Sequence, residues 1–493
     1  MRNNQRSEDN KLISGSDWQY ISILLGIGFL TRMIFFSQIY LISVDGAFQY
    51  IPVAKLFAWG EYREALNQVQ LPLYPLLVAV FSRITGNFEV SGQIISFLAS
   101  TLAVIPLFLL GKYIFGETAG FWGCIFYLLN PEMLQRSVDV LKEGLLIFLL
   151  FSAVFLFYLF LSRRKMFWLV ASTIVTLLGM LTRVVSLIFI PVFIFWILFL
   201  KKKPFDINFY KRLRYVLVIL ALCSTVVIPL VMNIKAATGQ WDISKKTVSA
   251  RALVESIFFD KKVEMGQVER GPLKLVRKII KVYHPVVFLF LLAGLIGRKA
   301  TPRDFFKEMF LFSFIFGYLI IIGLLMWSTQ RYLFFPILLS YVWAGAGAVE
   351  VQGRVMRKVH LSPQKATLGL FILIFVVFLP VLLKPQRADK LPRKAIGLWI
   401  KGQEIGRPLI LTDAQRVAYY AEGDLLMLNE WNYKKNSAEA RAKRIKYIVV
   451  ERENIEKNYP GFLELVKKDF SPQKVPLLSE REQEKYLVFK SRY

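Results

Sequence analysis

Residues 37–81 decide the membrane topology of the rest of this chain. They read "SQIYLISVDGAFQYIPVAKLFAWGEYREALNQVQLPLYPLLVAVF". The stretch begins as the end of a long apolar run and places Asp45 immediately beyond that run. The segment after Asp45 is too polar to span a bilayer and too apolar to be a solvated loop. A carboxylate where a membrane helix leaves the bilayer is costly, so Asp45 is a candidate functional group.

The segment "AFQYIPVAKLFAWGEYREAL" (47–66) explains this mixed character. It has an apolar face that bears Trp59 and a charged face that bears Lys55 and Glu61. Such a pattern is typical of helices that lie in the membrane interface. We therefore expect residues 43–91 to form a first outer loop built of interfacial helices.

The whole chain has the composition of a polytopic membrane protein. Of its 493 residues, 55% are hydrophobic and 15% are aromatic, and the mean hydropathy is +0.46. Many apolar runs exceed the roughly 18 residues that suggest a spanning helix. Eleven runs are candidate spans: 18–42, 92–113, 118–133, 141–161, 166–181, 184–200, 214–234, 284–297, 306–327, 332–350 and 366–383. The run at 71–85 is short for a span, and whether it crosses or lies in the interface stays open.

The formal net charge of +28 does not indicate nucleic acid binding, because the basic residues fall in short clusters between the apolar runs. Such clusters mark the cytoplasmic side of a membrane protein. They are "RNNQR" (2–6), "SRRK" (162–165), "KKKPFDINFYKRLR" (201–214), "GRKATPR" (297–303) and "QGRVMRK" (352–358). Placing all of them inside predicts about eleven spans, a cytoplasmic N-terminus, an extracytoplasmic C-terminus and an outer position for Asp45.

Cysteine and histidine usage argues against a disulfide framework or a histidine-based metal site. The two cysteines, Cys124 and Cys223, both lie inside apolar runs and lack metal-ligand spacing. The histidines number two, His284 and His360. The N-terminal sequence "MRNNQRSEDNKLISGSDW" has no short apolar core with a cleavage site, so it does not read as a signal peptide.

The composition changes after Lys384, which predicts a transmembrane domain over 1–384 and a small α/β domain over 385–493. Four segments read as strands, at 407–413, 425–428, 446–451 and 485–490, and two as helices, at 438–445 and 459–470. The parity of the spans places this domain outside the membrane. A second large outer segment, 235–283, is rich in Lys and Arg and is expected to form a basic outer loop.

Ionisable residues collect at the predicted outer ends of the spans, where they are candidate site residues. The set comprises Asp45, Arg136, Asp139, Glu143, Arg183, His284 and Arg331, with Gln330 and Tyr332 beside the last. Arg136, Asp139 and Glu143 are spaced i, i+3, i+7, which predicts one shared helical face. Arg32, inside the first span, is expected to contact a neighbouring helix.

Each candidate also has a purely structural interpretation. A terminal Arg such as Arg183 or Arg331 can snorkel to the interface. Arg136, Asp139 and Glu143 can form a local ion-pair set, and His284 can simply begin a helix. Asp45 can act as the N-cap of the helix that follows it. The gathering of these groups on one side of the membrane favours a functional site, because independent snorkelling would not prefer the outer face.

Several motifs resemble the bacterial family 39 glycosyltransferases of the GT-C fold, relatives of protein O-mannosyltransferases and of the lipid A aminoarabinose transferase. The motifs are "SVDGAFQY", "PLYPLLVAVFSRITGN", "GKYIFGETAGFWGCIFYLLNPEMLQRSVDVLKEGLL", "GMLTRVVSLIFIPVFIFWILF", "STQRYLFFPILLSYVWAGAG" and the tail "AIGLWIKGQEIGRPLILTDAQRVAYYAEGD". They follow one another in order over most of the chain. The resemblance implies transfer of a sugar from a polyprenyl-phosphate donor, by an inverting reaction, to a lipid, glycan or protein acceptor at the outer face of a bacterial inner membrane.

The resemblance also bears on cofactors. Mannosyltransferase relatives often carry Asp-Glu in the first outer loop, whereas Asp45 is followed here by Gly46. The missing second acid argues against a bound divalent metal, and no other cofactor is expected. It also argues against the metal-dependent oligosaccharyltransferase branch.

The chemistry implied by this family assigns roles to the candidates. A carboxylate can take the proton of an attacking hydroxyl, which makes Asp45 the candidate base. Arg suits a leaving phosphate through its planar fork of donors, so Arg331 and Arg183 are candidate phosphate ligands. Arg136 and the basic segment 235–283 are weaker candidates.

Two other functions stay open. A flippase or transporter of lipid-linked sugars would need polar residues near the bilayer midplane and related halves, and neither is evident. A polymerase or ligase of lipid-linked glycans would share the outer-face site but use an oligosaccharide donor. Release of free polyprenyl phosphate distinguishes the transferase from the transporter.

Overall fold

The computed structural model describes residues 13–68, 71–200, 208–239, 241, 279, 282–297, 304–324, 330–360, 362–384, 387–428, 444–459 and 461–492. These residues divide into two compact units. The first comprises Met1–Phe36 and Val53–Lys384, and the second comprises Ser37–Pro52 and Pro385–Tyr493. The predicted domain boundary lies at the same residue, Lys384. The inclusion of Ser37–Pro52 in the second unit was not predicted.

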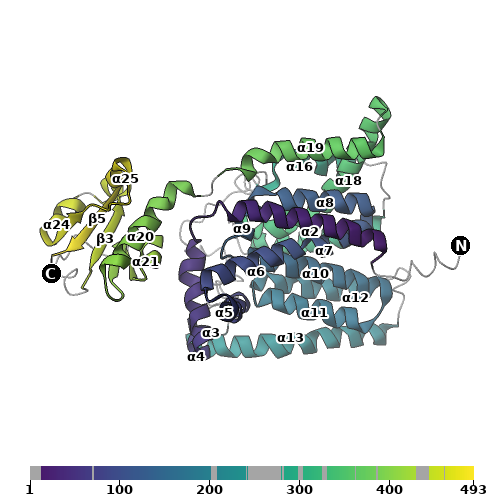
Figure 1. The fold of residues 1–493 in the computed structure, drawn as a ribbon. Coiled ribbons are helices and arrows are strands. Elements are labelled where there is room, and N and C mark those ends of the chain that lie inside the picture. The colour runs from purple at the N-terminus through teal and green to yellow at the C-terminus, as the bar shows by residue number, and fades with distance from the viewer. Residues whose placement is uncertain are drawn as a thin grey trace. The chain divides into compact units, whose positions relative to one another are not determined.

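The first unit is a bundle of helices that run side by side (Figure 1). The described helices are α2 (Gly15–Phe36), α6 (Phe88–Leu102), α7 (Val104–Phe115), α8 (Glu117–Leu129), α9 (Pro131–Ser137), α10 (Glu143–Arg163), α11 (Met166–Met180), α12 (Phe189–Phe199), α13 (Phe209–Thr238), α16 (Pro285–Ile296), α17 (Phe305–Leu324), α18 (Phe334–Val359) and α19 (Pro363–Leu382). Each of the eleven predicted apolar runs falls on one or two of these helices. Within the described residues, seven helical segments are long and apolar enough to cross a membrane.

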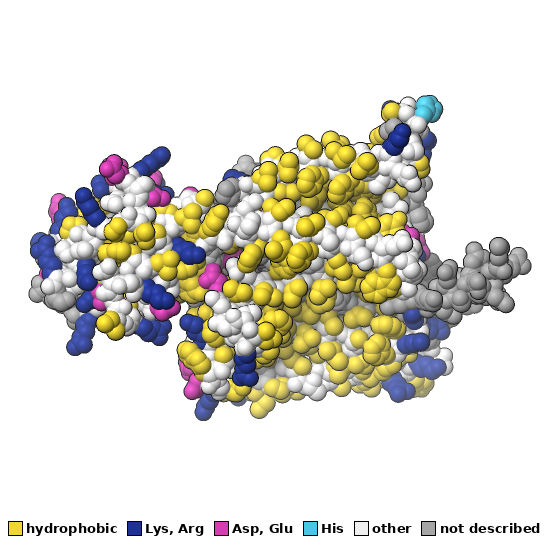
Figure 2. Space-filling view, viewed as in Figure 1, with side chains coloured by type: hydrophobic (Ala, Val, Ile, Leu, Met, Phe, Trp, Pro, Cys, Tyr) yellow, Lys and Arg dark blue, Asp and Glu magenta, His cyan; other side chains and the backbone are white. Residues whose placement is uncertain are grey.

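The outer surface of this bundle is apolar, as the surface of a multi-pass membrane protein must be. Figure 2 shows hydrophobic side chains spread over the visible side of the helices. Large side chains such as Leu30 of α2 and Phe316 of α17 are 62% and 67% exposed. Apolar exposure on this scale in water would cause aggregation, so lipid is the natural solvent of this surface.

Close helix packing inside the bundle depends on glycine. A Cβ atom at Gly347 of α18 would overlap the carbonyl oxygen of Phe290 of α16, and one at Gly294 of α16 would overlap the carbonyl oxygen of Trp343. Helices α16 and α18 therefore approach to backbone contact. The prediction for Arg32 is confirmed, because its Nε donates to Ser100 Oγ of α6 at 2.8 Å.

The predicted interfacial segment is helical and differs in direction from the bundle. It contains α3 (Ile51–Trp59) and α4 (Tyr62–Gln68), and from Val53 onward both belong to the first unit. They run across the ends of the bundle helices (Figure 1). Helix α5 (Leu73–Thr85) follows, with Gly86 in the left-handed conformation at its end. This arrangement fits helices lying in the interface, which stays a prediction.

The second unit contains a five-stranded sheet of order β2-β1-β3-β5-β4. Strands β1 (Leu409–Thr412), β2 (Asp424–Met427) and β3 (Tyr447–Glu451) are parallel, and β5 (Tyr486–Ser491) and β4 (Phe470–Gln473) are antiparallel additions. The predicted α/β class is confirmed, and all four predicted strands are present. Strand β4 was not predicted. Of the predicted helix 438–445, residues 438–443 lie outside the described residues.

Helices cover both faces of this sheet. On one face, α20 (Leu391–Gln403) and α21 (Arg416–Tyr420) pack against the sheet through Ile396, Ile400 and Val417. On the other, α23 (Arg452–Asn458) and α24 (Phe462–Asp469) pack through Ile455, Phe462 and Val466. The alternation of buried side chains along β3 supplies both layers, as expected of a strand in the middle of a sheet.

Candidate functional site

A buried ion pair forms the centre of the candidate site in the first unit. Glu143 is the first residue of α10, and Arg183 precedes the 3-10 turn Val184–Ile188 after α11. Arg183 Nη2 donates to Glu143 Oε1 at 3.0 Å, and the two residues are 5% and 1% exposed. Arg183 lies in the connection between α11 and the 3-10 turn, which places it at a helix end.

A third segment joins this pair, at the 3-10 turn η3 (Gln330–Tyr332) before α18. Arg183 Nη1 donates to the carbonyl oxygen of Arg331 at 3.3 Å. The Arg183 guanidinium also lies 4.6 Å from the ring centroid of Tyr332, within cation–π range. Arg183 therefore ties together the start of α10, the end of α11 and the start of α18.

Further cations surround the same carboxylate. The charges of Arg136, Arg331 and Lys142, together with Arg183, all interact with Glu143. Arg136 Nη2 also forms an ion pair with Glu132 Oε2 of the same helix at 3.6 Å. The Arg136 guanidinium lies 4.9 Å from the centroid of the Phe334 ring. Four cationic side chains thus act on Glu143, and one of them, Arg136, also pairs with Glu132; this leaves an excess of positive charge over these two carboxylates, which suits an anionic ligand.

The carboxylate itself keeps one oxygen available. Among the described residues, Glu143 Oε2 is buried and has no hydrogen-bond partner. A buried carboxylate oxygen left unpaired is costly, so a donor from a ligand would be bound favourably there.

The prediction that Arg136, Asp139 and Glu143 share one helical face is wrong. Arg136 lies on α9, which ends at Ser137, whereas Glu143 begins α10. Asp139 lies in the connection between them and accepts the Val140 amide at 2.8 Å. An Asp side chain that bonds a nearby backbone amide disfavours a continuous helix, and the spacing of the three residues does not reveal this bond. The break leaves Arg136 and Glu143 close in space by a different route.

Asp45 lies in the second unit, directly before the short π-helical segment η1 (Gly46–Tyr50). Its side chain makes no capping hydrogen bond to that segment, so the N-cap interpretation is not supported. The first unit holds the arginine cluster around Glu143. Convergence of Asp45 with these arginines stays a prediction.

The remaining predicted residues have varied positions. His284 precedes α16, adopts a positive φ of 57°, and its ring lies 4.3 Å from that of Phe378. These contacts agree with its structural interpretation. Gln330 begins the turn η3, and its side chain lies outside the described part of the chain. Of the basic loop 235–283, residues 240, 242–278, 280 and 281 lie outside it as well.

Sequence reasoning missed two residues of this region. Tyr318 of α17 is buried and interacts with Arg183. Asn130 donates to Tyr341 Oη at 2.8 Å and to the Val282 carbonyl oxygen at 2.9 Å. The motif Asn130-Pro131, an N-cap followed by Pro at the first helical position, was a usable signal for the start of α9. Nothing in the sequence singles out Tyr318 from the other aromatic residues.

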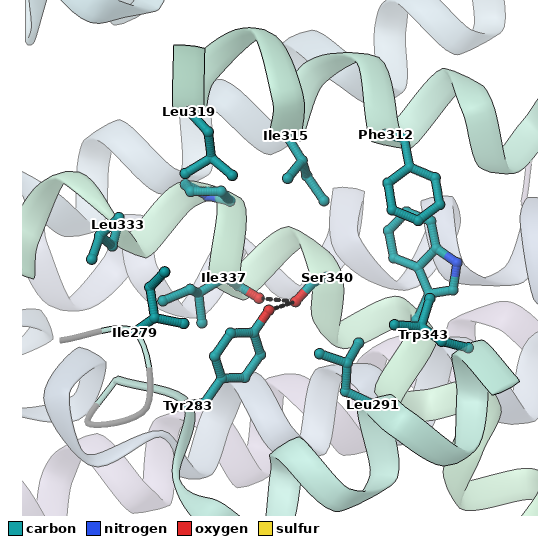
Figure 3. A pocket seen from close by; sticks show the side chains of 12 residues that line it. Ile279, Tyr283, Leu291, Phe312, Ile315, Leu319, Leu333, Ile337, Ser340 and Trp343 are labelled. Carbon is teal, nitrogen blue, oxygen red and sulfur yellow. Dashed lines mark hydrogen bonds between the residues drawn. The ribbon is translucent and has the colours of Figure 1, made fainter. Parts of the chain in front are cut away.

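An apolar pocket of about 170 Å³ lies between α16, α17 and α18 (Figure 3). Its lining is aliphatic and aromatic, with one polar pair, Tyr283 Oη and Ser340 Oγ, 2.5 Å apart. Leu333, two residues after Arg331, is part of the lining. The pocket therefore begins in the same chain segment that supplies Arg331 and Tyr332 to the cluster.

No cluster of three or more His, Cys, Asp or Glu side chains arranged to hold a metal ion occurs among the described residues.

A family profile described as dolichyl-phosphate-mannose-protein mannosyltransferase matches residues 69–228, about a third of the chain. That range includes Arg136, Glu143 and Arg183. A search of curated protein sequences finds no match.

Solved structures show the fold of the whole chain. The chain is similar to ArnT from Cupriavidus metallidurans bound to undecaprenyl phosphate, with a TM-score of 0.62, 11% identity, and coverage of 97% of this chain and 98% of that one. It is similar to the oligosaccharyltransferase of Archaeoglobus fulgidus, with a TM-score of 0.61, 15% identity, and coverage of 92% and 72%. Arabinofuranosyltransferase AftD from Mycobacteria matches with a TM-score of 0.51 and 12% identity over 96% of this chain and 41% of its own length.

These matches confirm the predicted resemblance to family 39 transferases and the GT-C fold. The chain is a multi-pass membrane protein with a small C-terminal sheet domain.

Proposed function

We propose that this protein is a membrane glycosyltransferase that moves a sugar from a polyprenyl-phosphate donor to a lipid, glycan or protein acceptor. The observation that carries the proposal is the buried Arg183–Glu143 pair with the added charges of Arg136 and Arg331. The cluster offers positive charge to a phosphate at the end of an apolar bundle. A polyprenyl phosphate likewise carries its charged phosphate at the end of an apolar chain, so its two parts match the cationic cluster and the apolar bundle.

The donor's two parts have separate partners in this scheme. Arg331 and Arg183 bind the phosphate, with Tyr332 stacked against the Arg183 guanidinium. The apolar pocket between α16, α17 and α18 takes part of the polyprenyl chain. Undecaprenyl phosphate is bound by the structurally similar ArnT, which supports a donor of this class.

Transfer then needs one bond to form and one to break. An acceptor oxygen attacks the anomeric carbon of the sugar, and the bond from that carbon to the phosphate oxygen breaks. Attack from the face opposite the phosphate inverts the configuration. The electron pair leaves with the phosphate, whose growing charge the arginines stabilise. Asp45 takes the acceptor proton if the acceptor is a hydroxyl group.

Glu143 orients the cluster rather than reacting. Its Oε1 accepts from Arg183, which fixes the direction of the guanidinium. Its Oε2 accepts a hydroxyl of the donor sugar, which completes the hydrogen bonding of this buried carboxylate.

The orientation in the membrane is part of the proposal. We infer a bacterial inner membrane, with the N-terminus cytoplasmic and both the arginine cluster and the second unit on the outer side. Accessibility labelling of single cysteines placed at exposed Lys165 and exposed Arg407 checks this. Labelling of both from one side would contradict it.

The decisive experiment uses the purified protein in nanodiscs with defined polyprenyl-phosphate sugars and candidate acceptors. We expect free polyprenyl phosphate to be released by the wild type only when an acceptor is present, and not by Asp45→Asn. Movement of intact donor between leaflets without release would identify a transporter. Turnover that requires an oligosaccharide donor would identify a polymerase or ligase instead.

A further inference from the structure

The segment that carries Asp45 is built into the C-terminal domain. Residues Ser37–Pro52 group with Pro385–Tyr493 although more than 300 residues separate them in the sequence. The contacts that join them include hydrogen bonds to the backbone of Tyr40, Leu41 and Ile42 and the packing of Phe48 on the core of the domain.

Two side chains of helix α21 bind the backbone amide and the backbone carbonyl of Ile42. The Ile42 amide donates to Tyr420 Oη at 3.0 Å, and the Ile42 carbonyl oxygen accepts from Arg416 Nε at 2.7 Å. Arg416 and Tyr420 are each 8% exposed, so both bonds lie in a buried environment. Loss of either would leave a buried polar group without its partner.

Two further cations bind the residues just before Ile42. Arg387 Nη1 donates to the Leu41 carbonyl oxygen at 3.0 Å, and Lys394 Nζ donates to the Tyr40 carbonyl oxygen at 3.1 Å. After Asp45, Phe48 packs against the core of the domain that contains Ile396 and Val417. The segment is therefore held on both sides of Asp45.

A tight turn carries this constraint to Asp45. Ser43 Oγ accepts the Gly46 amide at 3.1 Å, and the Ser43 carbonyl oxygen accepts the Ala47 amide at 3.0 Å. Asp45 lies inside this turn, three residues after Ile42. Movement of Ile42 relative to α21 would therefore displace the Asp45 carboxylate.

We propose that the C-terminal domain is the platform that positions Asp45, with Arg416 and Tyr420 as positioning residues that act through the backbone of Ile42. The proposal rests on the proposed role of Asp45 as the base. A carboxylate that must meet an acceptor hydroxyl works within a narrow range of geometry, and a displacement of about 1 Å can cost up to about 100-fold in rate. The domain supplies that precision, which a solvent-exposed loop alone does not.

The test compares Arg416→Met and Tyr420→Phe with wild type in nanodiscs, using the lipid-phosphate release assay and hydrogen exchange. Each variant removes one bond to Ile42 and keeps most of the side chain. We expect faster exchange in peptides covering Tyr40–Ala47 and unchanged exchange in β3. In kinetics, we expect kcat to fall at least about 10-fold while KM for the donor changes by less than about twofold.

Arg407→Met is the matched control, because Arg407 is in the same domain and its side chain is 76% exposed. It should match wild type in both measurements. Faster exchange with an unchanged kcat would overturn the proposal, as would unchanged exchange at Tyr40–Ala47 in both variants. If Asp45→Asn turns over as fast as wild type, the proposed role of Asp45 is wrong. The positioning role of Arg416 and Tyr420 is then wrong as well. That failure is visible in Asp45→Asn alone, so it is distinguishable from failure of the platform.

Discussion

Arg183 Nη2 lies 3.0 Å from Glu143 Oε1, and both side chains are almost entirely buried at the end of an apolar helix bundle. Removing two charges from water is expensive, and a well-packed apolar pair is often as stable as a buried ion pair. Arg136 and Arg331 also act on the Glu143 carboxylate. A functional role therefore explains this buried ion pair better than a contribution to stability does.

Single substitutions at this pair should destabilise the fold, and the double substitution should separate stability from activity. Arg183→Met or Glu143→Leu removes one partner of a buried, hydrogen-bonded charge pair, which we expect to cost up to about 3–5 kcal/mol. The double variant removes both charges and should recover most of the thermal stability. It should still release little polyprenyl phosphate, because Arg183, one of the two proposed phosphate ligands, is gone. Thermal melts and the release assay on all three variants measure this.

The pair formed by Lys112 and Asp17 serves as the control for this prediction. Asp17 belongs to the start of α2, at the opposite end of the bundle from α9 (Figure 1). Replacing both Lys112 and Asp17 by apolar residues should leave turnover within about twofold of wild type in the folded fraction. Full activity of the Arg183 and Glu143 double variant would remove the pair from the mechanism.

Asp45→Asn should abolish transfer without unfolding the protein. The amide has nearly the same shape as the carboxylate but cannot take a proton, so the loss should be about 100-fold or more in kcat for a hydroxyl acceptor. Asp389→Asn, at an exposed position in the same unit, should behave as wild type. Equal turnover by Asp45→Asn would show that Asp45 is not the base.

The helices of the bundle could be predicted from the sequence because apolar runs of membrane length leave few alternatives. The ionisable residues at the helix ends could each be singled out as candidate site residues, because a charged side chain is conspicuous in an apolar context. What they contact could not be predicted. The relation of Arg136 to Glu143 depends on the break between α9 and α10, where the Asp139 side chain accepts the Val140 amide. Periodicity carries no sign of that break.

The packing of Ser37–Pro52 with the C-terminal domain could not be predicted from the sequence for a different reason. The groups that α21 binds are the amide and the carbonyl of Ile42, and every residue has these groups. A sequence gives no signal for a bond to a backbone 374 residues away. Strand β4 was missed because it contains Pro472 and two polar residues, a composition that only an edge strand tolerates.

Gly347→Ala should destabilise the bundle, because the added methyl group meets the Phe290 carbonyl oxygen across the α16–α18 contact. Overpacking of this kind costs roughly 1–3 kcal/mol. The same substitution at Gly369 of α19, where nothing lies within 4 Å of the added atom, should be neutral or slightly stabilising. Thermal melts in detergent measure both variants. Equal melting temperatures would mean that α16 and α18 do not approach as closely as described.

The stability of the C-terminal domain should depend on pH through Glu451. Burial raises the pKa of Glu451, but the hydrogen bond and charge of Arg393 outweigh burial and hold that pKa below its ordinary value of 4.5. A carboxyl with a lowered folded pKa stabilises the fold above its ordinary pKa, and this contribution is lost as the pH falls through the lowered value. Below about pH 4.5, wild type should therefore lose stability more steeply than Glu451→Gln.

Hydrogen-exchange protection of β3 and β5, corrected for the pH dependence of intrinsic exchange, measures this difference. Burial, and also the charge of Glu451, raises the pKa of Asp413, so Asp413 is replaced by Asn in both proteins to remove its titration from the comparison. Glu484→Gln, at an exposed position, should follow the wild-type curve. If protection falls with pH equally in wild type and Glu451→Gln, Glu451 is not the source of the pH-dependent stability.

Filling the pocket between α16, α17 and α18 should penalise long polyprenyl donors selectively. Ile315 of α17 lines this cavity of about 170 Å³, and Trp at that position would occupy much of it (Figure 3). If the pocket takes part of the polyprenyl chain, Ile315→Trp should raise KM about 10-fold for a donor of undecaprenyl length and leave KM for a short-chain donor nearly unchanged, because the phosphate still reaches Arg183 and Arg331. The neighbouring Phe316, 67% exposed, offers the matched control Phe316→Trp, which adds an indole outside the pocket and should change neither value. An equal loss for both donors would mean that the substitution disturbs the bundle as a whole. An unchanged KM for both would mean that the chain of the donor takes another path.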